Sequence, residues 1–248
     1  MVYQTWSGEV SLNDFLITCE HGGNRIPAAY RSLFHGHRKL LNSHNGHDPG
    51  ALTMARSLAL ALNGPLVAAT VSRLLIDLNR PVGHPQLYSE ITRNAPADTR
   101  AELASLYHRP YQEKVERLVG ESVSRGRRVI HISSHSFTAE LNGKVRRADV
   151  GLLYDPGRRG ETELCARWKE RLADIAPKFR VRRNYPYEGR SAGLTAHLRL
   201  KHPASTYVGI ELEINQGIVC AAGPSWIRLR RIVSRSLLAA ITSSSGER

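Results

Sequence analysis

Short apolar runs bounded by turn-forming residues recur along the chain, and such runs predict buried β-strands. The runs cover residues 15–19, 65–70, 74–78, 129–133, 150–154 and 207–214. Apolar positions at the helical period lie between them, at residues 50–62, 99–123, 161–173 and 225–241. Because strands alternate with helices, the pattern predicts an α/β fold with three α/β/α layers and a largely parallel or mixed central sheet.

No internal repeat or linker interrupts the 248 residues. We therefore expect a single domain over residues 1–242 and a short polar tail at 243–248. Residues 81–98 show neither the helical nor the strand period. We interpret them as a long loop, a kind of segment that often carries function in compact domains.

The chain is strongly basic, with a formal net charge of +13 that lies mostly in residues 125–248. Either a polyanionic partner or a surface that attracts small anions would explain this charge. The chain has only four Phe and no RNA-binding motif, so nucleic acid is the less favoured partner.

Three features predict a protein of the reducing cytoplasm that has no membrane partner. The apolar runs are far shorter than the roughly 18 residues of a membrane helix. The first residues lack the basic and apolar regions of a signal peptide. The cysteines, Cys19, Cys165 and Cys220, are too few and too scattered for a disulfide framework.

Polar side chains follow several of the predicted strands at the point where each strand ends. They are His21, Asn79, Arg80, His135 and Glu213. Ligands of open α/β sheets bind at the carboxyl ends of the strands, so these side chains are expected to meet at one edge. Imidazoles suit zinc, a nearby carboxylate can move a proton, and a guanidinium can hold a substrate carboxylate. The set therefore predicts metal-assisted hydrolysis of a small molecule.

Several histidines and acids also have purely structural interpretations. His21 could cap a turn and His135 could be a core histidine, but their positions favour function, whereas packing is favoured for His131 within its strand. Glu211 shares a strand face with Glu213, and one of the two could face solvent. A His-rich loop could form a second metal site, but a solvated loop is favoured; its histidines are His35, His37, His44 and His47. Arg73 and Arg80 could simply pair with Asp77.

Five segments, taken in order, resemble the N-formylglutamate amidohydrolase family. They are CEHGGNRIP at 19–27, HDPGA at 47–51, SRLLIDLNRP at 72–81, HISSHSFT at 131–138 and ELEINQG at 211–217. The family is related to the zinc carboxypeptidases, aspartoacylase and succinylglutamate desuccinylase. The resemblance implies a zinc-dependent amidase with one metal ion that removes a formyl or similar acyl group from an acidic amino acid.

The resemblance also implies roles for individual residues. His21 and His135 match metal ligands, and Asn24 stands where the wider superfamily has a glutamate ligand, so Asn24 and Asp48 both remain candidates for the third ligand. Further roles concern the substrate and the reaction: Asn79, Arg80 and Ser134 bind substrate, Arg73 stabilises the oxyanion, and Glu213 is the general acid and base.

The function expected from the sequence is therefore zinc-dependent hydrolysis of an N-acyl amino acid, with N-formyl-L-glutamate as the first choice. The missing glutamate ligand keeps an alternative open, in which a degenerate hydrolase scaffold binds a polyanion without catalysis. A third hypothesis is a metal-free hydrolase with Cys19 or Ser134 as nucleophile, although no G-x-S-x-G elbow is present.

Overall fold

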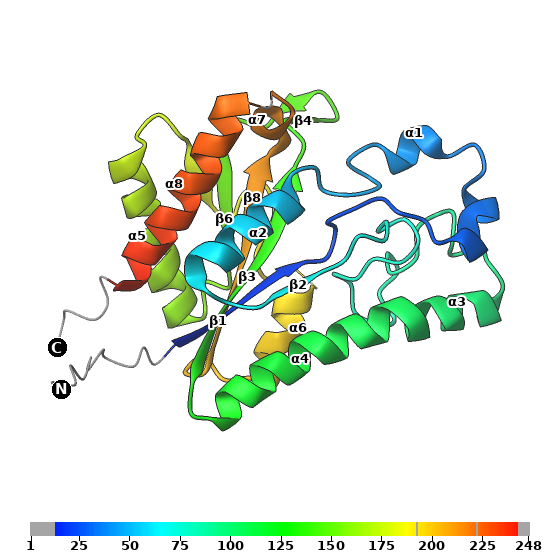
Figure 1. The fold of residues 1–248 in the computed structure, drawn as a ribbon, viewed down its shortest axis with the longest axis horizontal. Helices are drawn as coiled ribbons and strands as arrows, with labels where there is room; N and C mark the ends of the chain where they lie inside the picture. Colours follow the sequence, from blue (N-terminus) through cyan, green and yellow to red (C-terminus); the bar gives the residue numbers. More distant parts are fainter. Residues whose placement is uncertain (1–12, 192, 222, 243–248) are drawn as a thin grey trace, which may run out of the picture.

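A central six-stranded sheet organises the computed structural model, which describes residues 13–191, 193–221 and 223–242. The strand order is β2-β1-β3-β8-β6-β7 (Figure 1). Neighbouring strands are parallel, except that β6 runs antiparallel to β8. The strands are β1 (Asn13–Cys19), β2 (Leu66–Ala68), β3 (Arg128–Phe137), β6 (Val150–Leu153), β7 (Val181–Arg183) and β8 (Tyr207–Asn215). The mixed, mostly parallel sheet confirms the predicted fold class.

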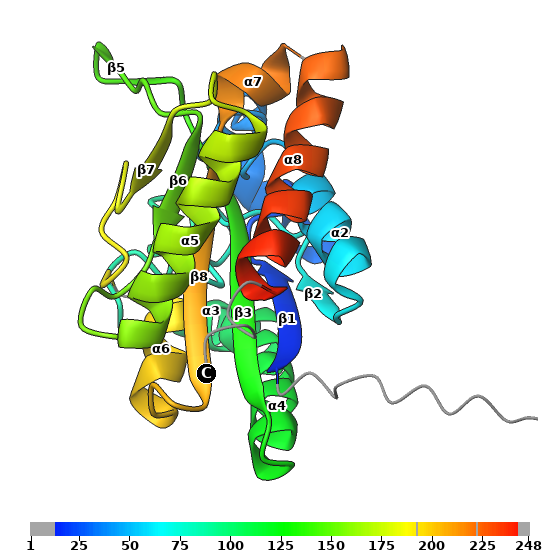
Figure 2. The same ribbon diagram turned by 90° about the vertical axis from the view of Figure 1, so that its left-hand side faces the viewer.

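Helices cover both faces of this sheet, as Figures 1 and 2 show. On one face lie α2 (Ala51–Leu62), α5 (Arg159–Ile175) and α8 (Gly223–Thr242), packed around Trp168 and the apolar side chains of β1, β3, β6 and β8. On the other face lie α4 (Arg109–Ser124) and α6 (Leu194–Lys201). The two apolar cores sandwich the sheet, which confirms the three predicted layers.

The predicted helix at 99–123 is three consecutive helical segments: α3 (Ala97–Leu103), a single π-helical stretch η2 (Ala104–His108), and α4. Pro110 at the start of α4 has no backbone N–H to donate to the preceding turn, which fits the change of hydrogen-bond pattern there. The sequence pattern did not predict α6 or β7. It also did not predict the short elements η1 (Ala28–Phe34), α1 (Arg38–Leu41), α7 (Gln216–Cys220), β4 (Glu140–Leu141) and β5 (Lys144–Val145).

The prediction of a strand at residues 74–78 is wrong. This segment forms turns, although Leu75 and Ile76 are buried in the second core. Its backbone is bonded by the loop rather than by a sheet: the Asp77 N–H donates to Leu87 O at 2.8 Å, and Ser89 Oγ donates to Leu74 O. A short apolar run shows burial, and burial alone does not distinguish a strand from a covered loop.

Residues 81–96 contain neither helix nor strand, which confirms most of the predicted loop. The predicted tail at 243–248 lies outside the described residues, and the domain boundary at 242 stays a prediction. Within the described ranges, none of the helices combines the length and the apolar character needed to span a membrane.

Candidate metal centre and active site

Three buried side chains, His21, Asp48 and His135, meet at the carboxyl edge of the sheet. One ligand atom from each lies within 4.8 Å of the others. His21 follows β1 and His135 lies in the last half of β3, and these strands are parallel neighbours whose ends share an edge. Asp48 precedes α2, and its backbone N–H donates to His21 O at 2.9 Å. The sheet register therefore brings together residues that are far apart in the sequence.

Glycine allows the chain after β1 to turn tightly beside the sheet. A Cβ on Gly22 would lie 2.8 Å from Ala69 O, and a Cβ on Gly23 would lie 2.6 Å from Thr70 O. Since real Cβ atoms do not approach backbone oxygen so closely, only glycine lets this segment pack against the chain that follows β2. This close packing fixes the backbone that carries His21.

His21 has one ring nitrogen engaged and one directed at the centre. Its Nε2 lies 2.6 Å from Asp77 Oδ1. Its buried Nδ1 has no hydrogen-bond partner among the described residues and lies 3.5 Å from Asp48 Oδ2. Asp77 therefore favours the tautomer that carries its proton on Nε2, which leaves the Nδ1 lone pair for a ligand.

His135 is held in the same way by a different carboxylate. Its Nδ1 lies 2.9 Å from Asp48 Oδ2, and its Nε2 lies 3.0 Å from Glu20 Oε2 and 2.9 Å from Ser133 Oγ. Glu20 is fully buried and accepts hydrogen bonds from Ser133 Oγ and Tyr111 Oη. Burial alone would raise the pKa of Glu20, but hydrogen bonds from His135 and Ser133 hold it at about 2.

The group fits a divalent metal ion. Two imidazoles and one carboxylate are a donor set of catalytic zinc sites, which have three protein ligands. Each histidine directs Nδ1 inwards and has an outer carboxylate on Nε2, an arrangement typical of metal-binding histidines. The unpartnered Nδ1 of His21 has the position and the lone pair that a metal ligand needs.

The structure brings Asp48 to the two histidines, whereas Asn24 is engaged elsewhere. The side-chain amide of Asn24 donates to Leu41 O at 3.2 Å and to Asn42 Oδ1 at 2.9 Å. Asn24 lines neither of the two cavities that adjoin the centre. Of the two candidates for the third ligand, the geometry favours Asp48.

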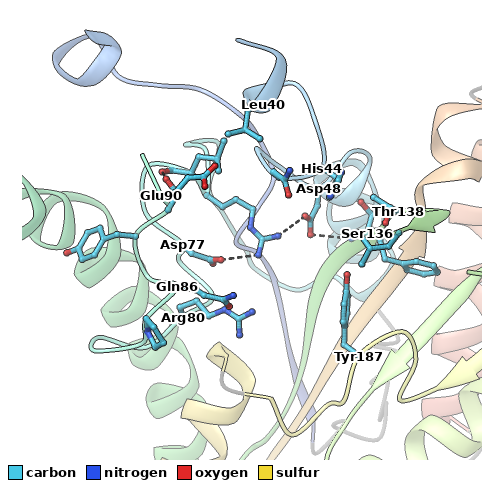
Figure 3. Close-up of a pocket in the computed structure, with 18 of the residues that line it drawn as sticks. Leu40, His44, Asp48, Asp77, Arg80, Gln86, Glu90, Ser136, Thr138 and Tyr187 are labelled. Atoms are coloured by element: carbon cyan, nitrogen blue, oxygen red, sulfur yellow. Dashed lines mark hydrogen bonds and ion pairs between the residues drawn. The ribbon is translucent and has the colours of Figure 1, made fainter. Parts of the chain in front are cut away.

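Arg73 links the centre to Asp77. Its guanidinium lies 3.3 Å from Asp48 Oδ1 and 3.0 Å from Asp77 Oδ2. Figure 3 shows Asp48 and Asp77 on either side of this guanidinium. Burial by itself would lower the pKa of Arg73, but the Asp77 and Asp48 carboxylates outweigh burial and raise this pKa above its ordinary value. The ion pair expected between Arg73 and Asp77 is thus present, and the arginine also lines the cavity beside the histidines.

A cavity of about 250 Å³ opens onto the centre. Its walls include Asn79, Arg80, Glu211 and Glu213. Glu213 pairs in register with His135 across β3 and β8, and its buried Oε2 has no hydrogen-bond partner in the described part of the chain. Burial raises the pKa of Glu213 to about 8. An acid with this pKa, next to the candidate metal centre, can exchange protons near neutral pH.

The sequence profile of a family described as N-formylglutamate amidohydrolase matches residues 13–220. The chain belongs to the N-formylglutamate amidohydrolase family. The matched region contains the whole group of His21, Asp48, His135 and Glu213.

Two solved structures of other proteins share the fold of this chain. The crystal structure of gene product Atu2144 from Agrobacterium tumefaciens matches with a TM-score of 0.80 at 28% identity, covering 94% of this chain and 92% of that one. An N-formylglutamate amidohydrolase from Ralstonia eutropha JMP134 matches with a TM-score of 0.69 at 19% identity, covering 95% of each chain. A metallo-carboxypeptidase from Burkholderia cenocepacia reaches only 0.40, which is too low to support an argument. No curated protein matches the sequence.

Two site residues of this family member had no clear sequence signal. Glu20 directly precedes His21, and Asp77 lies in a segment predicted as a strand and was considered only as a partner of Arg73 and Arg80. In the structure they are the outer partners of His135 and His21. The place of Glu20 beside the candidate ligand His21 was the only available hint, because the pairing of acid and imidazole depends on the tertiary fold.

Ser134 does not line the cavity, in contrast to its expected role in substrate binding. Its Oγ donates to Ala51 O at 3.0 Å, on the α2 side of the sheet. Ser136 lines the cavity instead, and its N–H lies 3.4 Å from Asp48 Oδ2. The sequence does not show which serine of β3 faces the cavity, because that depends on how the strand end packs against its neighbours.

The remaining histidines have structural surroundings. His131 is buried and bonded to Thr18 Oγ1 and Tyr207 Oη, as the packing interpretation expected. The His-rich loop forms no metal-type group with acids or cysteines in the described chain. Three of its histidines are exposed, which agrees with a solvated loop: His35, His37 and His44.

Proposed function

We propose that the protein is a zinc-dependent amidohydrolase that acts on N-acyl amino acids, with N-formyl-L-glutamate as the substrate expected from its family. The observation that carries this proposal is a buried group of His21, Asp48 and His135 beside an unpartnered Glu213. Three metal-type donors with an adjacent acid form the constellation of a metal-dependent hydrolase. Zinc bound there would polarise the amide carbonyl and activate water.

Glu213 is the proton carrier of this proposal. It accepts a proton from the attacking water and returns it to the leaving amine, so one carboxylate serves as base and then as acid. The C–N bond breaks, a C–O bond forms to the water oxygen, and the products are a carboxylic acid and a free amine. A pKa of about 8 in the metal-free protein places this group close to the range where both forms are populated.

Arg73 and the pair Asn79–Arg80 have separate roles in the proposal. The Arg73 guanidinium lines the cavity next to Asp48 and stabilises the developing oxyanion. Asn79 uses its Oδ1 to accept from the Leu194 N–H at 2.8 Å, which orients its side-chain NH₂ as a donor. Asn79 and Arg80, both in the cavity wall, hold the carboxylate of the substrate.

Elemental analysis of the purified protein, together with hydrolysis of N-formyl-L-glutamate before and after chelation, tests this function. We expect about one zinc per chain, loss of activity with the chelator and recovery when zinc is returned. Activity that persists after the metal has been removed would contradict the proposal. A zinc-loaded protein that hydrolyses no N-acyl amino acid would contradict it as well.

The two alternative functions receive less support. The polyanion hypothesis depended on a missing acidic ligand, and Asp48 supplies a carboxylate at the centre. The metal-free hypothesis depended on Cys19 or Ser134. The Ser134 hydroxyl donates to Ala51 O on the α2 side of the sheet. Cys19 is fully buried, and burial and the nearby Glu20 and Asp48 carboxylates raise its pKa well above its ordinary value. A thiol in that state is a poor nucleophile.

A further inference from the structure

The cavity of about 250 Å³ at the candidate metal centre has room for the amine half of the proposed substrate. Asn79 and Glu213 line this inner cavity and do not line the larger cavity of about 540 Å³ that adjoins it. In the proposed reaction the leaving nitrogen must reach Glu213 and the substrate carboxylate must reach Asn79. The amino acid portion of the substrate, with its side chain, therefore occupies the inner cavity.

Most acidic, basic and histidine side chains of the inner wall already have a role in the proposed function. Three are candidate metal ligands, two act on the reacting amide and one holds the substrate carboxylate. They are His21, Asp48 and His135, then Arg73 and Glu213, then Arg80. The two that remain, Glu188 and Glu211, are both acidic. Because the chain has 35 Lys and Arg against 22 Asp and Glu, its overall charge does not explain this pair.

Glu211 is fixed beside the group that holds the substrate carboxylate. Its Oε1 accepts a hydrogen bond from Thr195 Oγ1 at 2.7 Å, and Asn79 Oδ1 accepts one from the Leu194 N–H at 2.8 Å. Consecutive residues at the start of α6 thus hold the two side chains. A Cβ on Gly193 would lie 2.9 Å from Asn79 Oδ1 and 3.3 Å from Glu211 Oε1, so both oxygens lie against the same glycine. The side chain of an amino acid whose carboxylate is bound at Asn79 therefore starts close to Glu211.

The protein supplies no cation for these two carboxylates within the ranges that the structure describes. Neither Glu188 nor Glu211 forms an ion pair there, and Glu188 is exposed. Burial is the main cause of the raised pKa of Glu213, and the Asp48 and Glu211 carboxylates raise it further. Negative charge is therefore concentrated at this end of the cavity. A positive group of the substrate would be attracted there, whereas a further carboxylate would be repelled.

We propose that the inner cavity selects N-acyl amino acids whose side chain carries an amine or a guanidinium, with Glu211 and Glu188 binding this cation. The inference rests on the proposed amidohydrolase function and specifies its substrate class. It places a basic amino acid ahead of glutamate as the amine half of the substrate.

A series with one acyl group and three side chains tests the inference on the zinc-loaded full chain. The substrates are the Nα-formyl derivatives of L-lysine, L-glutamine and L-glutamate, whose side chains are positive, neutral and negative. We expect kcat/KM to fall in that order, by at least about tenfold from lysine to glutamate, because the carboxylates attract the first and repel the last. A kcat/KM for the glutamine or glutamate derivative that equals or exceeds that for lysine would overturn the inference and leave the amidohydrolase function intact. Failure to hydrolyse any of the three would overturn both.

Removal of the Glu211 charge provides a second test. Glu211→Gln keeps an acceptor oxygen for Thr195 and removes the negative charge. The ratio of kcat/KM for the lysine derivative to that for the glutamate derivative should fall at least about fivefold. The change should appear mainly in KM, because the ion pair forms when the substrate binds. Since all three substrates meet the same Glu213, a shift in the pKa of Glu213 affects them alike and cancels in the ratio.

The exposed member of the pair provides a variant that does not disturb the core. Glu188→Gln should lower the same ratio by a smaller factor than Glu211→Gln, because solvent screens an exposed charge. Glu170→Gln, at an exposed position of α5, is the matched control and should leave the ratio unchanged. If Glu211→Gln and Glu188→Gln both keep the lysine-to-glutamate ratio of the unaltered protein, the proposal is wrong.

Discussion

The two faces of the sheet are built differently. The face with α2, α5 and α8 is covered by regular helices around one apolar core. The other face has α4 and α6, but much of its core lies under residues 71–96, which contain no named helix or strand. Arg73, Asp77, Asn79 and Arg80 all belong to this irregular segment, whereas the candidate ligands His21 and His135 come from the ends of β1 and β3. The difference shows that regular elements provide the frame and that covered loops place the polar groups around the centre.

The largest effect that we expect is a loss of catalytic rate at the centre without a loss of bound metal. Glu213→Gln should lower kcat by about 10²–10⁴-fold, because the amide cannot carry the proton between water and amine. Bound zinc, measured by elemental analysis, should stay near that of the unaltered protein. Glu163→Gln, at an exposed glutamate of α5, is the control and should have no effect. Activity retained by Glu213→Gln would remove Glu213 from the mechanism.

Two leucines, one in each core, test the contrast between the faces directly. Leu75 in the covered loop and Leu172 in α5 are both fully buried. Each substitution to Ala should lower the free energy of unfolding by about 2–5 kcal/mol, measured by urea denaturation. Only Leu75→Ala should also weaken metal binding, because Leu75 anchors to the core the segment that carries Asp77 two residues later. Equal metal affinity in the two variants would contradict a positioning role for the loop.

The outer carboxylate on His21 should affect metal affinity more than stability. Asp77→Asn should weaken zinc binding by about 10–100-fold, since the ring loses the carboxylate that fixes its tautomer. Competition with a chelating dye measures this affinity. Asp174→Asn, at an exposed position of α5, is the matched control. If Asp77→Asn binds zinc as tightly as the control, Asp77 is only a partner of Arg73.

The smallest expected effect concerns the second buried histidine of β3. Burial lowers the pKa of His131 to about 4 from an ordinary 6.5. The unfolded chain therefore binds more protons than the folded one between these values, and stability falls as the pH drops through this window. We expect His131→Gln to reduce that loss by about 2 kcal/mol, measured as unfolding free energy between pH 7 and 4. An unchanged pH dependence would show that His131 does not contribute.

Much of the frame could be predicted from periodicity. The strands at 15–19, 129–133 and 207–214 lie within β1, β3 and β8, because continuous apolar runs mark strands buried on both sides. The helices of the α2, α5 and α8 face were predicted to within a few residues for the same kind of reason. The run at 74–78 was misassigned because a covered loop can be as apolar as a strand.

The site was predictable as a set of residue types and not as a set of contacts. His21, His135 and Glu213 stood at strand ends, where ligands of such sheets bind, and all three line the inner cavity. The choice between Asn24 and Asp48 could not be made from the chain, because both lie in loops whose course depends on packing. The same limit applies to Ser134 and Ser136, because only the packing of β3 shows that Ser136 lines the cavity and that Ser134 faces α2.

The sequence by itself determined the alternation of strands and helices, the family and the residue types available for chemistry. These depend on local period and on motifs, which are properties of neighbouring residues. Only the tertiary structure decided that Asp48 joins the two histidines, that Asp77 and Glu20 hold their outer nitrogens, and that a second cavity adjoins the centre. Each of these facts joins segments that are distant in the chain, and contacts of that kind are set by strand register and by how loops cover the sheet edge.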